Sequence, residues 1–142
     1  MSTKFTAKAS VVIHASREKV WEALTSPEKI KQYLFGTNAV SDWKVGGQLI
    51  FKGEWEGKTY EDKGVILASD KPRLFKYTYW SGMSGMEDKP ENYMVITYEL
   101  KDVDGGTELL LTQDNSPNEQ SRDHSEQNWK IVLDGLKKVA EA

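Results

Sequence analysis

Cysteine is absent from this sequence of 142 residues. The chain can therefore form no disulfide framework, no thiolate metal site and no cysteine nucleophile, and this composition suits a reducing compartment. Histidine is scarce, with two residues, so covalent or general-base chemistry near neutral pH has few candidate side chains. We accordingly expect a protein that works without a metal or an organic cofactor.

Long apolar runs and blocks of like charge are also missing. No apolar stretch approaches the roughly 20 residues that a membrane helix needs, and the start, MSTKFTAKAS, lacks the apolar core of a signal peptide. The 19 basic and 22 acidic residues are interspersed and give a net charge of −3, which makes nucleic acid and anionic membranes poor partners. We expect a cytoplasmic protein that binds neither nucleic acid nor a membrane.

Apolar and aromatic side chains, by contrast, are plentiful enough for a sizeable core. They make up 38% and 11% of the chain, which suits one globular domain of ordinary size. No internal repeat or low-complexity linker divides the sequence. We therefore expect a single domain spanning residues 1–142.

The first third of the chain predicts a strand followed by two short helices. Apolar residues alternate with polar ones over residues 5–13, the pattern of a half-buried strand. Ser16 is placed to cap a helix formed by REKVWEALT, and Pro27 stands where a second short helix would begin.

The middle of the chain predicts an antiparallel meander. Five segments read as strands separated by short turns and one longer loop: QLIFKGEW, KTYEDKGVILAS, LFKYTYW, NYMVITYEL and TELLLTQDN. The weaker segment TNAVSDW adds one more short strand. Sequential strands with short links pair antiparallel.

After Pro117 a helical period returns and predicts one helix over residues from about 119 to 139. Its apolar stripe comprises Trp129, Val132, Leu133, Leu136, Val139 and Ala140. Gly135 inside this helix costs about 1 kcal/mol relative to alanine, so we expect it to face a close neighbour. The first half, NEQSRDHSEQ, is almost wholly polar.

These elements predict an α+β fold in which the long helix covers the apolar face of a curved sheet. Because the helix is polar at one end and apolar at the other, one end should lie over the core. The other end should border a wet opening. Trp129 starts the apolar stripe and should stand at the boundary between the two.

Three stretches resemble a known superfamily. HASREKVWEALTSPEKIKQY resembles a segment of the SRPBCC superfamily, whose members include START-like and Bet v-like proteins. DWKVGGQLIF and the closing HSEQNWKIVLDGLKKV resemble its branch named after the activator of the ninety-kilodalton heat-shock chaperone ATPase. The resemblance implies the helix-grip fold, in which a seven-stranded sheet grips a long C-terminal helix and encloses a cavity.

Alternation along the strands predicts which side chains face such a cavity, since side chains two apart share a face. The inward sets are Leu49, Phe51 and Trp55; Phe75, Tyr77 and Tyr79; Met94, Ile96, Tyr98 and Leu100; and Leu109, Leu111 and Gln113. Composition alone does not distinguish a packed core from a pocket. As ligand-binding candidates we select Tyr33, Trp43, Phe51, Trp55, Tyr77, Tyr79, Met94, Tyr98, Gln113, His124, Trp129 and Leu133.

These candidates favour a neutral or weakly polar ligand. Tyrosine and tryptophan supply flat apolar area with a few polar tips, and the inward sets contain neither lysine nor arginine. Relatives often have histidine at the position of His124, which implies a role at the cavity mouth, whereas His14 reads as a solvated junction residue. The loop WSGMSGMEDKPENY is either a lid over the entrance or a plain mobile hairpin loop.

Catalytic and metal-binding motifs are not found. The sequence has no Gly-x-Ser-x-Gly elbow. DVDGG begins like a calcium loop, but Thr107 and Gln113 stand where that loop requires glycine and a bidentate glutamate. Gly46 and Gly47 precede a strand, so they form no dinucleotide fingerprint. We expect neither catalytic nor metal-ligating residues.

Three functions stay open. The first is binding of a small hydrophobic or aromatic molecule under the final helix, by a monomer or weak dimer. The second is modulation of a chaperone, which the resemblance disfavours because the eukaryotic co-chaperones carry an additional N-terminal domain. The third is weak catalysis like that of the superfamily's cyclases and hydrolases. An open cavity under Trp129 would favour the first, and a filled interior with an exposed apolar patch the second.

Overall fold

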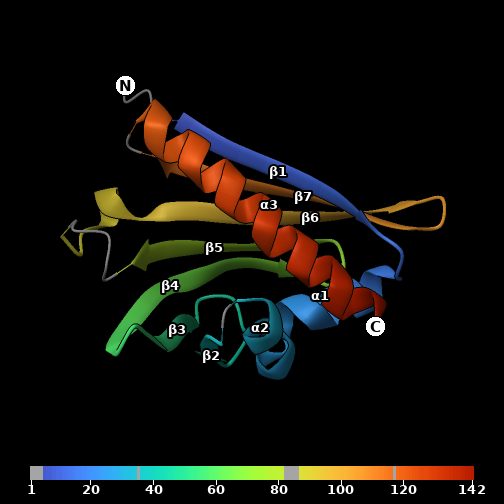
Figure 1. Cartoon of the computed structure of the whole chain (residues 1–142), viewed down its shortest axis with the longest axis horizontal. Helices are drawn as coiled ribbons and strands as arrows, with labels where there is room; N and C mark the ends of the chain where they lie inside the picture. Colours follow the sequence, from blue (N-terminus) through green and yellow to red (C-terminus); the bar gives the residue numbers. More distant parts are fainter. Residues whose placement is uncertain (1–4, 35, 82–86, 117) are drawn as a thin grey trace.

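The chain folds into one seven-stranded antiparallel sheet with a long helix across its concave face, in a computed structural model (Figure 1). The structure describes residues 5–34, 36–81, 87–116 and 118–142, apart from the side chain of Trp55. The elements are β1 (Phe5–Ile13), α1 (Arg17–Thr25), α2 (Pro27–Tyr33), β2 (Asn38–Ser41), β3 (Gln48–Trp55), β4 (Lys58–Asp70), β5 (Leu74–Ser81), a 3₁₀ turn at Pro90–Asn92, β6 (Met94–Val103), β7 (Gly106–Ser116) and α3 (Glu119–Glu141).

The sheet order is β1-β7-β6-β5-β4-β3-β2. Strands β2 to β7 are sequential neighbours, as the short turns predict, and β1 closes the sheet by pairing with β7. This α+β helix-grip arrangement confirms the predicted fold class, including the weakly predicted strand β2. No helix within the described ranges combines the length and the apolar character needed to span a membrane.

The helix boundaries follow from local capping. The Ser16 hydroxyl accepts a hydrogen bond from the Lys19 N–H, and Pro27 occupies the first turn of α2, both as predicted. The Asn118 side chain accepts from the Ser121 N–H at 2.7 Å and starts α3. These contacts satisfy N–H groups that a helix otherwise leaves unpaired.

The position of α3 decides where the interior is filled. Its C-terminal half buries Val132, Leu133, Leu136 and Ala140, and it packs mainly on β1, α1 and α2. A Cβ added at Gly135 would lie 3.1 Å from the Tyr33 Cβ, so this glycine has the close neighbour that we expected. Because α3 lies towards the β1 side (Figure 1), its polar half leaves part of the concave face uncovered.

Strand alternation predicted the inward face correctly. Ten of the predicted inward side chains are buried, whereas Tyr79 and Met94 are half-buried. The buried ones are Leu49, Phe51, Phe75, Tyr77, Ile96, Tyr98, Leu100, Leu109, Leu111 and Gln113. Trp55 was also predicted to point inward, and its side chain lies outside the described part.

Side chains of α3 cap the free edge of β1. The Lys8 N–H donates to Glu126 at 3.0 Å, and the His14 N–H donates to Glu141 at 2.8 Å. The Lys137 ammonium donates to the Val12 carbonyl at 2.9 Å. Backbone groups that would otherwise offer an edge for pairing with another strand are thereby occupied.

Candidate functional site

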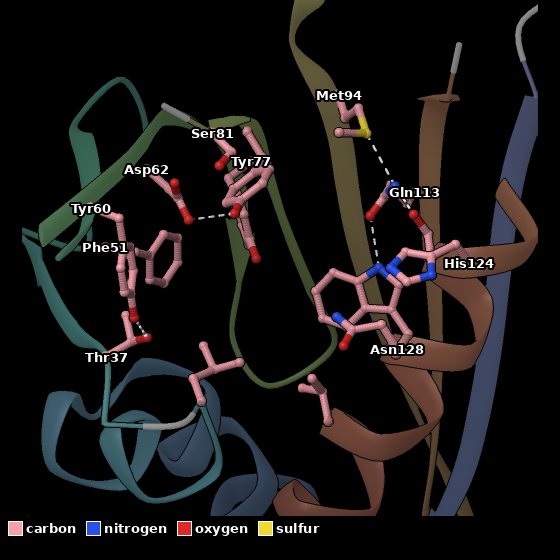
Figure 2. A pocket seen from close by; sticks show the side chains of 15 residues that line it. Thr37, Phe51, Tyr60, Asp62, Tyr77, Ser81, Met94, Gln113, His124 and Asn128 are labelled. Atoms are coloured by element: carbon pink, nitrogen blue, oxygen red, sulfur yellow. Dashed lines mark hydrogen bonds between the residues drawn. The ribbon is translucent and has the colours of Figure 1, made fainter. Parts of the chain in front are cut away.

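A cavity of about 400 Å³ lies between the N-terminal half of α3 and the concave face of the sheet (Figure 2). It is open to solvent on one side. Fifteen residues line it: Leu34, Thr37, Phe51, Tyr60, Asp62, Tyr77, Tyr79, Ser81, Met94, Gln113, His124, Ser125, Asn128, Trp129 and Val132.

Trp129 forms the wall on the α3 side. It is half-buried, and its ring meets the Tyr98 ring edge-on with centroids 6.3 Å apart. Its indole N–H donates to the Gln113 Oε1 at 2.7 Å. The residue therefore stands between the packed core and the cavity, where the polar half of the helix was predicted to end.

Gln113 fixes this wall to the sheet. It is buried on β7, and its Nε2 donates to the Ser125 hydroxyl at 3.1 Å and lies 3.0 Å from the Met94 sulfur. Both ends of the amide are thus occupied by protein groups. A molecule in the cavity would meet the Trp129 ring and Met94 rather than a free amide.

Aromatic rings form the facing wall. The ring centroid of Phe51 lies 6.1 Å from that of Tyr77 and 6.2 Å from that of Tyr79. The Tyr79 hydroxyl donates to the Asp62 Oδ2 at 2.6 Å, and Tyr60 and Thr37 share a hydrogen bond between their hydroxyls. Figure 2 shows Thr37, Phe51, Tyr60, Asp62 and Tyr77 opposite Met94, Gln113, His124 and Asn128.

Burial raises the pKa of two tyrosines of this wall, Tyr77 and Tyr79. Desolvation raises the pKa of Tyr77 well above its ordinary value. Desolvation likewise raises the pKa of Tyr79, and the negative charge of Asp62 and the hydrogen bond to it raise that pKa further. Both phenols therefore keep their protons near neutral pH, and Tyr79 acts as a donor to Asp62.

Seven of the twelve predicted site residues lie on the cavity wall: Phe51, Tyr77, Tyr79, Met94, Gln113, His124 and Trp129. They come from β3, β5, β6, β7 and α3, and the fold brings them together because their strands are neighbours under the helix. His124 is exposed at the rim.

Four predicted residues do not reach the cavity. Tyr33, Trp43 and Tyr98 surround a separate space of about 10 Å³, which is room for about one water molecule. The Tyr33 hydroxyl donates to the Ala23 carbonyl at 2.8 Å, so its polar tip is engaged in the core. Leu133 is fully packed in the core. The fifth, Trp55, has no described side chain.

Eight wall residues were not predicted: Leu34, Thr37, Tyr60, Asp62, Ser81, Ser125, Asn128 and Val132. Counting back by twos from buried Ile66 along β4 places Asp62 and Tyr60 on the inward face. Ser125 and Val132 share the face of Trp129 at helical spacing. Leu34 and Thr37 lie where α2 leads into β2, and no periodic pattern marks them.

Among the described residues that line the cavity, Asp62 carries the one formal negative charge, and none is a lysine or an arginine. Asn128 is exposed, and like His124 it makes no side-chain hydrogen bond within the described residues. No group of three or more metal-ligating side chains occurs in the described ranges. The predicted lid residues Met83 and Met86, with their glycines, fall outside those ranges.

Comparison with protein families identifies the family to which the chain belongs. The sequence profile described as "Activator of Hsp90 ATPase homolog 1-like protein" matches residues 14–141. The chain belongs to this family. It is thus an AHSA1-like domain of the SRPBCC superfamily, as the three stretches of sequence indicated. No curated protein matched the chain in a sequence comparison.

Solved structures of other proteins agree with this AHSA1-like assignment. Protein ChR145 from Cytophaga hutchinsonii is 51% identical, with a TM-score of 0.85 over 97% of this chain and 94% of that one. The Aha1 dimer from Colwellia psychrerythraea is 19% identical, with a TM-score of 0.74 over 96% of both chains. Ara h 8.0201 is 13% identical, with a TM-score of 0.75 over 96% of this chain and 97% of that one, and shares the fold.

Proposed function

We propose that this AHSA1-like protein binds a small, mainly apolar or aromatic molecule in the cavity between α3 and the sheet. The observation that carries the proposal is the cavity itself, at about 400 Å³. Protein cores are packed to the density of organic crystals and leave few voids larger than a water molecule. Small-molecule sites typically measure about 300–1,000 Å³.

The lining supports a ligand with a flat apolar body. Trp129 presents its ring on one side, and Phe51, Tyr77 and Tyr79 present theirs on the other. Aromatic side chains provide large contact areas at fixed positions. Because the described lining residues include no lysine or arginine, a carboxylate or phosphate buried among them would lack a compensating charge.

Modulation of a chaperone through a surface patch is less well supported. The large apolar side chains exposed in the described ranges come from several elements. Leu110, for example, has Ser10 and Glu99 as its cross-strand neighbours. Polar residues thus separate it from exposed Leu67 on β4.

Hydrolytic chemistry also finds little support in the cavity. A histidine base must be aligned with a nucleophile or a water and oriented by a third group. His124 makes no side-chain hydrogen bond to any described residue. The Gln113 amide, which lies on the same side of the cavity, is already engaged by Trp129 and Ser125.

Binding can be tested with prodan, a neutral naphthalene dye whose emission shifts to the blue in apolar surroundings. We expect saturable binding to the wild-type protein. Asn128→Trp should weaken it about tenfold, because Asn128 is an exposed wall residue and a larger side chain there would fill the cavity mouth.

Gln127→Trp is the matched control, since Gln127 is exposed on the same helix but does not line this cavity. It should leave prodan binding unchanged. Binding that fails to saturate, or that Asn128→Trp leaves intact, would overturn the proposed function.

A further inference from the structure

Asp62 on β4 is a carboxylate in an otherwise uncharged wall. Its cross-strand neighbours are Phe51 on β3 and Ser81 on β5, which also line the cavity. The strand alternates, so the adjacent Lys63 points to the opposite face, where its ammonium lies 2.6 Å from the Asp88 carboxylate. The nearest cation in the sequence is therefore paired elsewhere.

The hydrogen bonding of Asp62 is incomplete. An ionised carboxylate can accept about four hydrogen bonds, and the Tyr79 hydroxyl donates one of them to Oδ2. The other oxygen, Oδ1, is shielded from solvent and has no partner in the described structure. A buried acceptor left without a donor is unfavourable, so this carboxylate has an unmet requirement for donors.

The cavity is the direction from which a donor can arrive. Asp62 lines it, and Oδ2, which accepts one hydrogen bond from Tyr79, has a lone pair for a second donor. Figure 2 shows Asp62 on the wall opposite Gln113 and His124. A ligand could thus place a donor at Asp62 and its apolar body towards Trp129.

The surroundings of Asp62 favour a cationic donor. The rings of Phe51 and Tyr79, whose centroids are 6.2 Å apart, flank this end of the cavity. The faces of aromatic rings attract organic cations, and a hydrogen bond between an ammonium and a carboxylate is stronger than one between neutral groups. A carboxylate beside aromatic rings is therefore suited to a protonated amine.

We propose that Asp62 selects ligands that combine an aromatic or apolar body with a protonated amine, the ammonium donating to the carboxylate beside Phe51 and Tyr79. This inference rests on the proposed function, because it assumes that the cavity takes a small molecule. It adds the chemical class of that molecule. It also revises the expectation of a neutral or weakly polar ligand, which was formed without Asp62.

Three naphthalenes of similar size test the inference by displacement of prodan at neutral pH: 2-(2-naphthyl)ethylamine, 2-ethylnaphthalene and 2-naphthylacetate. With the wild-type protein, we expect the amine to bind about tenfold more tightly than the hydrocarbon. The carboxylate should bind more weakly than the hydrocarbon. This comparison uses only the wild-type protein. It therefore tests the preference for the amine even if a substitution at Asp62 impairs folding.

Asp62→Asn should remove the advantage of the amine and leave the affinity for 2-ethylnaphthalene unchanged. Glu61→Gln is the matched control, because it removes the same formal charge from an exposed neighbour on the outer face of β4. It should keep the advantage.

Two failures can be told apart. If the hydrocarbon and prodan bind but the amine binds no more tightly, or if Glu61→Gln abolishes the preference as fully as Asp62→Asn, then this inference is wrong and the proposed function stands. If none of the naphthalenes binds, the proposed function itself fails.

Discussion

At the scale of single residues, Trp129 connects the two parts of the interior. One side of its ring packs against the core near Tyr98, and the other borders the cavity. The hydrogen bond from its indole to Gln113 fixes the ring at this boundary. The stability that Trp129 provides should therefore be smaller than that of an enclosed aromatic residue.

We predict that Trp129→Ala lowers the free energy of unfolding by about 3 to 4 kcal/mol, the lower half of the usual range for buried aromatic residues. Part of the ring borders the cavity, so the ring makes fewer packing contacts than an enclosed ring, and its removal costs less. Urea denaturation measures the change. Phe75→Ala, which removes a ring that is 2% exposed, should cost more, and equal losses for the two variants would mean that the interior beneath Trp129 is filled.

Asp62 shows how far single residues could be predicted from the sequence. Its position on the inward face follows from alternation with Ile66, so this part was available from the pattern. That Oδ1 lacks a donor follows from what β3 and β5 place beside it. Contacts between strands depend on the pairing register, and the sequence of a single strand does not determine that register.

At the scale of elements, the contacts between α3 and the free edge of β1 make the stability of this edge depend on pH. Glu141 receives hydrogen bonds from the Lys137 ammonium and from the His14 N–H, and these lower the pKa of its carboxyl, Lys137 being the larger cause. A lowered pKa means that the folded state favours the ionised form. The contribution is present above the ordinary glutamate pKa of about 4.3 and is lost as the pH falls through the lowered value.

We therefore predict that the His14 amide is protected from hydrogen exchange near neutral pH and loses protection in acid, when Glu141 is protonated. Protection factors measured by NMR between about pH 3 and pH 7 test this across the ordinary glutamate pKa. In Glu141→Gln the uncharged side chain does not titrate, so protection at His14 should be lower and independent of pH. The same acid-dependent loss in this variant would refute the role of Glu141.

The elements were largely predictable, and so was an opening beside the polar half of α3, but the full set of residues around the cavity was not. Alternation, Ser16, Pro27 and the apolar stripe of α3 indicated the strands and helices within a few residues. The cavity arises because α3 packs against β1, α1 and α2, with Gly135 admitting Tyr33 closely. The lateral position of a helix on a sheet is a result of such tertiary contacts. Tyr33, Trp43 and Tyr98 accordingly pack in or against the core and do not line the cavity.

At the scale of the whole molecule, the AHSA1-like fold supplies a curved sheet and a helix that covers only part of it. The C-terminal half of α3 packs in the core, and the N-terminal half forms one wall of an open cavity. If the proposed function holds, stability and binding depend on different halves of one helix. A ligand bound only by the folded protein should also raise the melting temperature, by an amount that grows with the logarithm of its concentration above Kd.

The most direct test of the central claim is an NMR titration of the labelled protein with prodan. The account predicts that the Trp129 indole N–H and the Gln113 side-chain amide shift and saturate together, since both belong to the cavity wall. The Trp21 indole, which is buried against Phe75 away from the wall, should stay unchanged. Shifts confined to the exposed outer face of α3 around Ile131, or no saturable shift at Trp129, would contradict the claim that this cavity binds small molecules.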